Sequence, residues 1–326
     1  MPSLERPSST EASNETAVDA ARSGAAVRSC DGWGTLLVSG SERATWLEGL
    51  LTCQVGKLQP GQGTWGLALN RTGKIQSEVW VVAAADQLLL ALAPDTLDDV
   101  EAEFGRMLIM EDAELTRPTP ARHWFTLHGP EAAARAQQLA AQLGGAAAAI
   151  DWLGLGGAAL SVEEARAADV RAACAGQLLS DADWLRLRVE RNLPELGRDF
   201  DGKDRPHEAA LERRAVNWSK GCYLGQEVVC MQDMRGKVKR STRLLRVDAP
   251  AQSALPAGSE VLDASQQSLG SVTSSAYSPR AQSWLALARL DLDALEKHEV
   301  THGAGAPLSC GPAGSAHFPA LLSDPV

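Results

Sequence analysis

Apolar segments in this chain are short, and turn-forming residues separate them along the sequence. The chain contains no run of about 20 apolar residues, which a membrane-spanning helix requires. The nearest candidate, Gly144–Leu160, is rich in Ala and Gly and is interrupted by Asp151. We therefore expect several compact α+β subdomains and no membrane segment.

The first 240 residues mix the patterns of strands and helices. Trp65–Leu69 and Ile75–Ala83 lie on either side of the turn sequence Asn70–Gly73, which predicts a β-hairpin. Glu131–Leu143 is rich in helix formers and precedes two glycines, which predicts a helix with a glycine stop. Over Asp183–Arg191 apolar and charged residues alternate, which predicts a half-buried strand.

The C-terminal part has a different character. From Ser241 onward the apolar runs are short and Pro or Gly separates them, which predicts a small β-barrel. Residues 1–24 are rich in Ser, Ala, Thr and Glu, and they lack the features of a signal or organelle-targeting peptide. We predict a disordered tail over 1–27, two α+β subdomains over 28–240 with the second near 119–180, and the barrel over 241–326.

Charge and cysteine usage restrict the possible partners. The net charge of −10 disfavours attraction of the whole molecule to nucleic acid or to an anionic membrane. The six cysteines form no C-x-x-C pair, which is typical of free thiols in a reducing compartment and predicts a cytoplasmic protein. No His lies near a Cys at zinc-ligand spacing, so we predict no metal site.

The stretch Lys220–Glu227 combines more chemical groups than any other short segment. Cys222 lies between two glycines, which permit positive φ or close approach of another group. Lys220 and the N-terminus of a helix expected after Gly225 would both favour the thiolate, which is the reactive form of cysteine. Gln226 can donate and accept hydrogen bonds, as recognition of a heterocycle requires. The alternative is a structural segment with a buried Cys222, a helix cap at Gly225 and a surface pair of Lys220 with Glu227.

The sequence Lys220-Gly221-Cys222-Tyr223-Leu224-Gly225-Gln226-Glu227 resembles the signature of the YgfZ family, relatives of the glycine-cleavage T protein. The similarity continues in order over about residues 28–316 and includes Gly73-Lys74-Ile75 and the segment from Arg188 to Pro194. It implies three subdomains in a cloverleaf around a central folate-binding opening. It also implies a folate-binding accessory role in assembly or maintenance of iron–sulfur enzymes, including tRNA-modifying ones, with a functional thiol at Cys222 assisted by Lys220.

The resemblance further implies which residues contact a tetrahydrofolate or a derivative of it. Trp33 and Trp184 match aromatic positions that line the folate site, and an indole stacks well on a flat pterin. Glu190 could accept two N–H bonds from the pterin edge. Without the resemblance, core packing would explain both tryptophans, and a solvated strand face would explain Glu190. The remaining predicted ligand contacts belong to the signature and are Tyr223, Gly225, Gln226 and Glu227.

Two departures and one charge cluster leave alternatives open. Met231 stands where the family commonly has a basic residue. The hairpin after Gly73 keeps one acidic residue, Glu78, where the glycine-cleavage relatives use a pair, so tetrahydrofolate-dependent aminomethyl transfer is the second hypothesis. A basic run could hold the glutamate tail of a folate or a nucleic-acid phosphate, or be a solvated connector. This run consists of Arg235, Lys237, Lys239, Arg240, Arg243 and Arg246.

Overall fold

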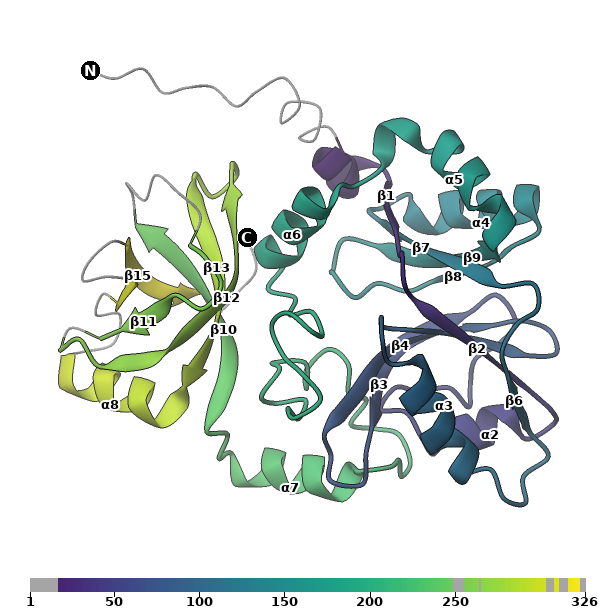
Figure 1. Cartoon of the computed structure of the whole chain (residues 1–326), viewed down its shortest axis with the longest axis horizontal. Helices are drawn as coiled ribbons and strands as arrows, with labels where there is room; N and C mark the ends of the chain where they lie inside the picture. Colours follow the sequence, from purple (N-terminus) through teal and green to yellow (C-terminus); the bar gives the residue numbers. More distant parts are fainter. Residues whose placement is uncertain (1–16, 249–254, 264, 303–307, 311–315, 323–326) are drawn as a thin grey trace. The chain divides into compact units, whose positions relative to one another are not determined.

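The computed structural model describes residues 17–248, 255–263, 265–302, 308–310 and 316–322 (Figure 1). The chain divides into two compact units. Unit 1 comprises the described residues up to Gly66 together with Glu78–Trp184, and unit 2 comprises Leu67–Ser77 together with the described residues from Leu185 onward. Within the described ranges, every helix is too short or too polar to span a lipid bilayer.

The first sheet of unit 1 has five strands in the order β3-β4-β5-β2-β6 (Figure 1). The strands β4 and β5 are buried along nearly their whole length; β5 is entirely apolar, and β4 is apolar from Val79 onward. Helix α3 packs against β2, and its first turn carries two acidic residues that suit the helix dipole. The elements are β2 (Gly34–Ser39), α2 (Arg43–Glu48), β3 (Gly63–Leu69), β4 (Ile75–Ala83), β5 (Leu88–Leu92), α3 (Leu97–Arg106) and β6 (Glu114–Thr116).

The second sheet of unit 1 has four strands in the order β1-β7-β9-β8. The helices α4 and α5 cover one face, where Phe125 and Leu127 of β7 join a fully apolar core. Alternate residues of β7 face the other way, and Trp124 donates from Nε1 to the Thr35 hydroxyl of β2 at 2.8 Å. The elements are β1 (Ala26–Ser29), β7 (Arg122–His128), α4 (Ala132–Leu143), β8 (Ala146–Ala149), β9 (Gly157–Glu163), and α5 (Ala167–Ala173) after a short 3-10 turn at Glu164–Arg166.

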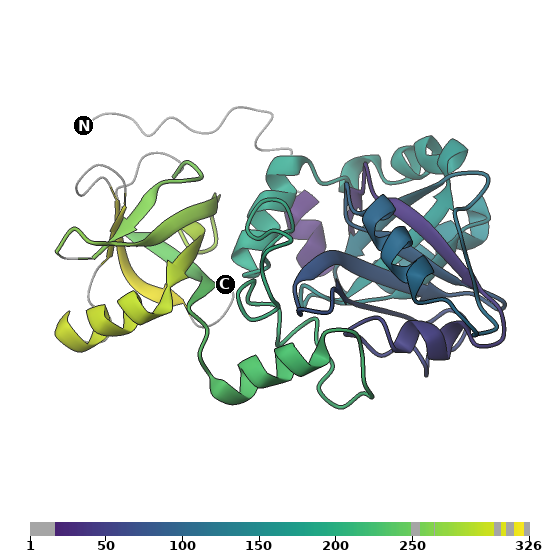
Figure 2. The ribbon, with the colours of Figure 1, turned by 60° about the horizontal axis from the view of Figure 1, so that its bottom comes forward.

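Unit 2 contains a closed barrel of strands in the order β10-β13-β12-β11-β14-β15 (Figure 2). Inward-facing aliphatic residues fill it, among them Leu245, Val272 and Ala288. The predicted α+β fold with a C-terminal barrel is therefore confirmed. The elements are α7 (Gln226–Arg235), β10 (Arg240–Asp248), β11 (Glu260–Leu262), β12 (Ser268–Ser278), β13 (Ser283–Asp291), α8 (Leu292–His302), β14 (Leu308–Cys310) and β15 (Ala316–Leu322).

A buried group of charged and hydroxyl side chains fixes the loop before the signature to the barrel. We call it the ion network; it comprises Arg188, Glu195, Asp199, Thr273 and Ser274. Arg188 is fully buried and ion-paired with Asp199. Asp199 accepts hydrogen bonds from the hydroxyls of Thr273 at 2.5 Å and Ser274 at 2.7 Å, and from the Glu195 N–H at 3.0 Å. These contacts satisfy both carboxylate oxygens of Asp199.

The tip of the β3–β4 hairpin, Leu67–Ser77, belongs to unit 2. The Ile75 N–H donates to the Asp204 carbonyl at 2.8 Å, and Arg205 Nε donates to the Thr72 carbonyl at 3.2 Å. The hairpin predicted at these residues is confirmed, and the predicted helix over Glu131–Leu143 corresponds to α4.

Two sequence-based expectations are wrong. Asp183–Arg191 is not a strand, because Asp181–Glu190 forms helix α6. Its start is capped reciprocally: Asp183 N–H donates to the Ser180 hydroxyl at 3.2 Å, and Ser180 N–H donates to the Asp183 carboxylate at 3.0 Å. Every side chain from Asp183 to Glu190 is at least partly buried, so the alternation of apolar and charged residues does not correspond to one exposed face.

The predicted tail over 1–27 ends too late in the chain. Residues 17–23 form a helix, and Ala26–Ser29 forms strand β1, which pairs with β7. Small apolar residues, including Val18 and Ala21, are fully buried here. A segment whose composition resembles that of a disordered tail therefore includes a short alanine-rich helix. Its small side chains allow it to pack closely. The first sixteen residues lie outside the described part.

Candidate functional site

Six aromatic side chains of unit 1 form a continuous set of ring contacts, which we call the ring cluster. Its members are Trp33, Trp65, Trp80, Trp152, Trp184 and His128. Trp33 stacks on Trp80 with ring centroids 4.1 Å apart, and Trp80 also meets Trp65 at 6.3 Å and Trp152 at 5.5 Å. His128 contacts Trp152 at 4.9 Å and stacks on Trp184 at 5.2 Å. The two tryptophans proposed from the sequence, Trp33 and Trp184, therefore lie at opposite ends of one cluster.

A tight turn positions Trp33. The Trp33 N–H donates to the Cys30 carbonyl at 3.3 Å, and Gly32 has φ of 78°, which a side chain would disfavour. Trp33 is only half-buried, whereas Trp65, Trp80 and Trp152 are buried. One indole of the cluster thus remains accessible beside a buried aromatic surface, as stacking of a flat ligand requires.

Three buried ring nitrogens of the cluster have no hydrogen-bond partner among the described residues. They are Nε1 of Trp65, Nε1 of Trp80 and Nδ1 of His128. A buried polar atom without a partner costs about 1–3 kcal/mol, so such groups usually indicate a missing water, ion or ligand. Two indole N–H donors and one imidazole nitrogen suit a flat ring with polar edges.

His128 is uncharged near neutral pH. Burial lowers its pKa to about 3, and the nearby Arg28 guanidinium acts in the same direction. Its Nε2 lies 3.0 Å from the Thr126 hydroxyl, and the Arg28 guanidinium carbon lies 4.2 Å from the centre of the Trp184 ring. The cluster therefore combines a neutral imidazole with a cation stacked at its edge.

The signature loop of unit 2 is held against the hairpin turn. Gly225 has φ of 79° and precedes α7, and a Cβ at this position would lie 2.5 Å from the Asn70 carbonyl oxygen. The side-chain oxygen Oδ1 of Asn70 in turn accepts hydrogen bonds from the N–H groups of Thr72 at 2.9 Å and Lys74 at 3.1 Å. Only glycine fits at residue 225 without moving the turn.

Within the loop, Cys222 is exposed and Lys220 is buried. The Lys220 ammonium lies 5.5 Å from the centre of the Tyr223 ring. Tyr223 is buried, its hydroxyl has no partner among the described residues, and burial is the main cause that raises its pKa. Gln226 begins α7 as predicted, and Glu227 is exposed in its first turn.

The other predicted contacts differ in environment. Glu190 is the last residue of α6 and is buried, with Arg186 Nε at 3.1 Å from its carboxylate, so it is not a solvated strand-face group. Glu78 is buried in β4. Met231 is exposed on α7. In the basic run, Arg235, Lys237, Lys239, Arg240 and Arg246 are exposed, whereas Arg243 is partly buried and bonded to the Ser241 hydroxyl at 2.7 Å.

Sequence reasoning missed most of the ring cluster. Trp65, Trp80, Trp152 and His128 lie on separate elements, and no local motif connects them. The available signal was composition, because nine of the fifteen aromatic residues are tryptophan. In the parts of the chain that the structure describes, no group of three or more His, Cys, Asp or Glu side chains could hold a metal ion.

Comparison with known proteins identifies relatives over most of the chain. Residues 4–174 match the GCVT N-terminal domain family, and residues 240–307 match the glycine cleavage T-protein C-terminal barrel domain. The "tRNA-modifying protein YgfZ" of Yersinia pestis (strain Pestoides F) is 21% identical over 72% of this chain and 74% of its own. The protein of the same name from Yersinia enterocolitica is 22% identical over 65% of this chain and 68% of its own.

The fold has a solved counterpart. The glycine cleavage system aminomethyltransferase T from Bartonella henselae superposes with a TM-score of 0.75 at 17% identity. The match covers 94% of this chain and 87% of the aminomethyltransferase. At this identity the likeness establishes a shared fold and leaves the chemistry of each chain to its own residues.

Proposed function

The chain belongs to the YgfZ type of the glycine cleavage T-protein superfamily, and from this premise we propose that it binds tetrahydrofolate or a derivative. We further propose that it acts, through Cys222, in the assembly or maintenance of iron–sulfur enzymes, including tRNA-modifying ones. Its partners in this proposal are a folate and iron–sulfur client proteins.

The ring cluster is the observation that supports folate binding. A pterin is a flat heterocycle with donors and acceptors along its edges. Trp33 offers a half-exposed indole for stacking, and Trp65, Trp80 and His128 offer ring nitrogens that lack partners among the described residues.

The ligand and the chain have separate tasks in this proposal. Tetrahydrofolate supplies a carrier of one-carbon groups when it is bound. The ring cluster binds and orients its pterin, while Trp184 and Glu190 remain predicted contacts, as do Tyr223, Gly225, Gln226 and Glu227. Because most of the aromatic side chains are buried, they would exclude water from the surroundings of the bound pterin.

The thiol part of the proposal depends on exposure. Cys222 is exposed in a loop that precedes a helix N-terminus, whereas Cys30 is buried and burial raises its pKa to about 11. A thiol that reacts with another protein must reach it, and among the cysteines with described environments Cys222 is the exposed one. Lys220, two residues earlier, remains the predicted assisting cation.

A titration of the purified full-length protein with tetrahydrofolate, followed by tryptophan fluorescence, tests the folate part. We expect saturable quenching, and we expect Trp33→Ala to weaken binding at least tenfold. Trp218→Ala is the matched control, because this indole is exposed and lies in unit 2, outside the ring cluster. Absence of saturable binding at high micromolar folate, or equal affinity of the Trp33→Ala protein, would contradict the site.

A deletion strain assayed for iron–sulfur enzyme activity tests the thiol part. We expect the wild-type chain to restore activity and Cys222→Ala to fail while it remains folded. Cys230→Ala controls for loss of a nearby, less exposed thiol. Full complementation by Cys222→Ala would refute the thiol role. The aminomethyltransferase hypothesis instead predicts turnover of an aminomethyl donor that Glu78→Gln abolishes.

A further inference from the structure

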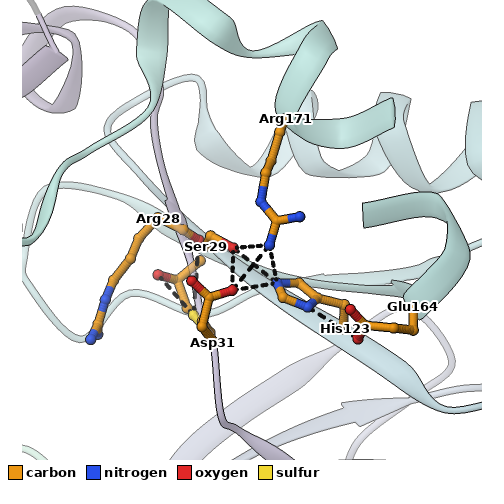
Figure 3. A network of polar contacts seen from close by, with 8 residues as sticks. Arg28, Ser29, Asp31, His123, Glu164 and Arg171 are labelled. Carbon is orange, nitrogen blue, oxygen red and sulfur yellow. Dashed lines mark hydrogen bonds and ion pairs between the residues drawn. The ribbon is translucent and has the colours of Figure 1, made fainter. Parts of the chain in front are cut away.

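One carboxylate oxygen at the edge of the second sheet of unit 1 has three polar neighbours (Figure 3). Asp31 Oδ1 accepts from Arg171 Nη2 at 3.0 Å and from the Ser29 hydroxyl at 3.1 Å, and it lies 3.5 Å from His123 Nε2. Asp31 is the second residue after the end of β1, and Trp33 follows it two residues later.

The three neighbours are themselves tied together. They come from different elements: Ser29 from β1, His123 from β7 and Arg171 from α5. Arg171 Nη2 donates to the Ser29 hydroxyl at 3.0 Å, and that hydroxyl lies 2.9 Å from His123 Nε2. On its other side, His123 Nδ1 lies 3.2 Å from the Glu164 carboxylate. The three groups that contact the Asp31 oxygen are therefore also linked to one another and to Glu164.

This network and the ring cluster lie on opposite faces of the same sheet. His123 shares the helix-covered face with Phe125, whereas His128 projects from the other face into the ring cluster. The turn Cys30–Trp33 leads from one to the other. Its first residue is fixed by the bond from Cys30 N–H to the Trp124 carbonyl at 2.9 Å, and its last residue stacks on Trp80.

Stability alone does not explain these contacts. The Asp31 side chain is 75% exposed, and ion pairs in such positions contribute little to stability. Their directional effect is larger, because a carboxylate fixed from three sides restricts the backbone of a four-residue turn. The contacts therefore matter more for where Trp33 lies than for whether unit 1 folds.

We propose that Asp31 is a latch residue, held by Arg171, Ser29 and His123, that keeps the Cys30–Trp33 turn closed and Trp33 stacked on Trp80. Its consequence for ligand affinity rests on the proposed folate function. The latch keeps the stacking surface formed before the ligand arrives. If release lowers the population with Trp33 in place to about one fifth, the apparent Kd rises about fivefold.

The first test needs no ligand. Two indoles stacked in contact give a coupled circular dichroism signal, which reports the Trp33–Trp80 pair in the full-length protein; a Trp33→Ala spectrum identifies it. We expect Asp31→Ala and Arg171→Met to diminish this signal, with the unfolding midpoint nearly unchanged. The matched control is Arg166→Met, which removes an exposed pair with Asp169 beside α5 and leaves the latch intact.

Two further variants separate a latch from general damage. Since Asp31 and Arg171 act through one contact, the double variant Asp31→Ala/Arg171→Met should lose no more signal than either single variant. Arg171→Lys keeps the charge but not the planar guanidinium, so its signal should lie between those of wild type and Arg171→Met. An unchanged coupled signal in Arg171→Met, or additive losses in the double variant, would overturn the latch.

Tetrahydrofolate titration of the same proteins distinguishes the two proposals. A wild-type protein that shows the coupled signal but binds no folate would refute the proposed function and leave the latch standing. Binding by wild type, with an approximately fivefold weaker Kd in Arg171→Met and no change in Arg166→Met, supports both. Binding of equal strength in Arg171→Met, despite a lost coupled signal, would refute the role of the latch in pre-forming the ligand surface.

Discussion

The ring cluster of unit 1 and the ion network of unit 2 are both largely buried, but their polar atoms differ in how they are partnered. In the ion network, Asp199 receives hydrogen bonds on both oxygens and pairs with Arg188, whose Nε makes no hydrogen bond but lies 3.4 Å from the Glu195 carboxylate. In the ring cluster, three nitrogens have no partner among the described residues. Saturated buried polar groups fix a structure, whereas unsaturated ones are suited to a ligand that completes them. The comparison thus contrasts a carboxylate with complete hydrogen bonding with three ring nitrogens that lack it, and the proposed ligand site lies with the latter.

The largest effect should follow from breaking the ion network. Asp199→Ala removes the shorter of the two ion pairs of the fully buried Arg188 and leaves it the Glu195 carboxylate at 3.4 Å; loss of one partner of a buried pair costs about 3–5 kcal/mol. Urea unfolding at neutral pH measures this loss. Asp169→Ala removes an exposed carboxylate paired with Arg166 and should cost less than about 1 kcal/mol. Equal, small losses in both variants would show that the buried Arg188–Asp199 pair stabilises the fold no more than an exposed pair does.

Next in size is the backbone fit that fixes the signature loop in the same unit. Gly225→Ala introduces a side chain at φ of 79° and 2.5 Å from the Asn70 carbonyl oxygen, so we expect a loss of at least about 2 kcal/mol. Gly221→Ala is the matched control in the same loop, because nothing lies within 4 Å of its Cβ position. The same urea assay applies, and similar stability of the two variants would show that the loop tolerates displacement.

An intermediate effect should appear in unit 1 as a pH dependence. The pKa of His128 falls from 6.5 to about 3 on folding, so below pH 6.5 the unfolded chain binds a proton that the folded chain does not. Stability is therefore lost as pH falls from 6.5 toward 3, by about 2 kcal/mol between pH 6.5 and 5. His128→Phe keeps a ring but cannot titrate. The urea midpoint should fall more between pH 6.5 and pH 5 in the wild type than in His128→Phe. An equal fall in both proteins would contradict the assignment.

The smallest predicted effect is stabilisation by ligand. Tetrahydrofolate at ten times its Kd should raise the free energy of unfolding by about 1.4 kcal/mol, because only the folded protein binds it. Hydrogen exchange should slow most in the segments that carry Trp65, Trp80 and His128, where unpaired nitrogens gain partners. Protection confined to the ion network would place the binding surface elsewhere.

Local sequence predicted the elements whose signal is local. The hairpin around Asn70–Gly73 and the helix ending before Gly144 follow from turn and cap chemistry, and both are present. Helix α6 was missed because Leu185, Leu187 and Val189 mimic the period of a strand while burial surrounds most of the helix. The cap at Ser180 was the local signal that could have corrected this.

The candidate site was less predictable than the fold. The signature and its glycines are contiguous, so residue types alone indicated a fixed loop at Gly225. The ring cluster joins residues more than a hundred positions apart, such as Trp33 and Trp152, and its contacts arise only when two sheets of unit 1 pack. Likewise, Asp31 and Arg171 meet through sheet pairing and helix packing, which single-sequence patterns do not encode.

The hairpin tip Leu67–Ser77 has a consequence for how the chain is made. Gly225 packs closely against the Asn70 carbonyl, yet Asn70 leaves the ribosome well before residue 225 is synthesised. At about 5–20 residues per second, this turn waits on the order of ten seconds for its partner loop. A fragment beginning at Leu185 would lack the turn altogether. Unit 2 is thus complete only with a segment that is synthesised early, Leu67–Ser77. Dividing the gene before Leu185 would separate the signature loop from the hairpin turn that it packs against.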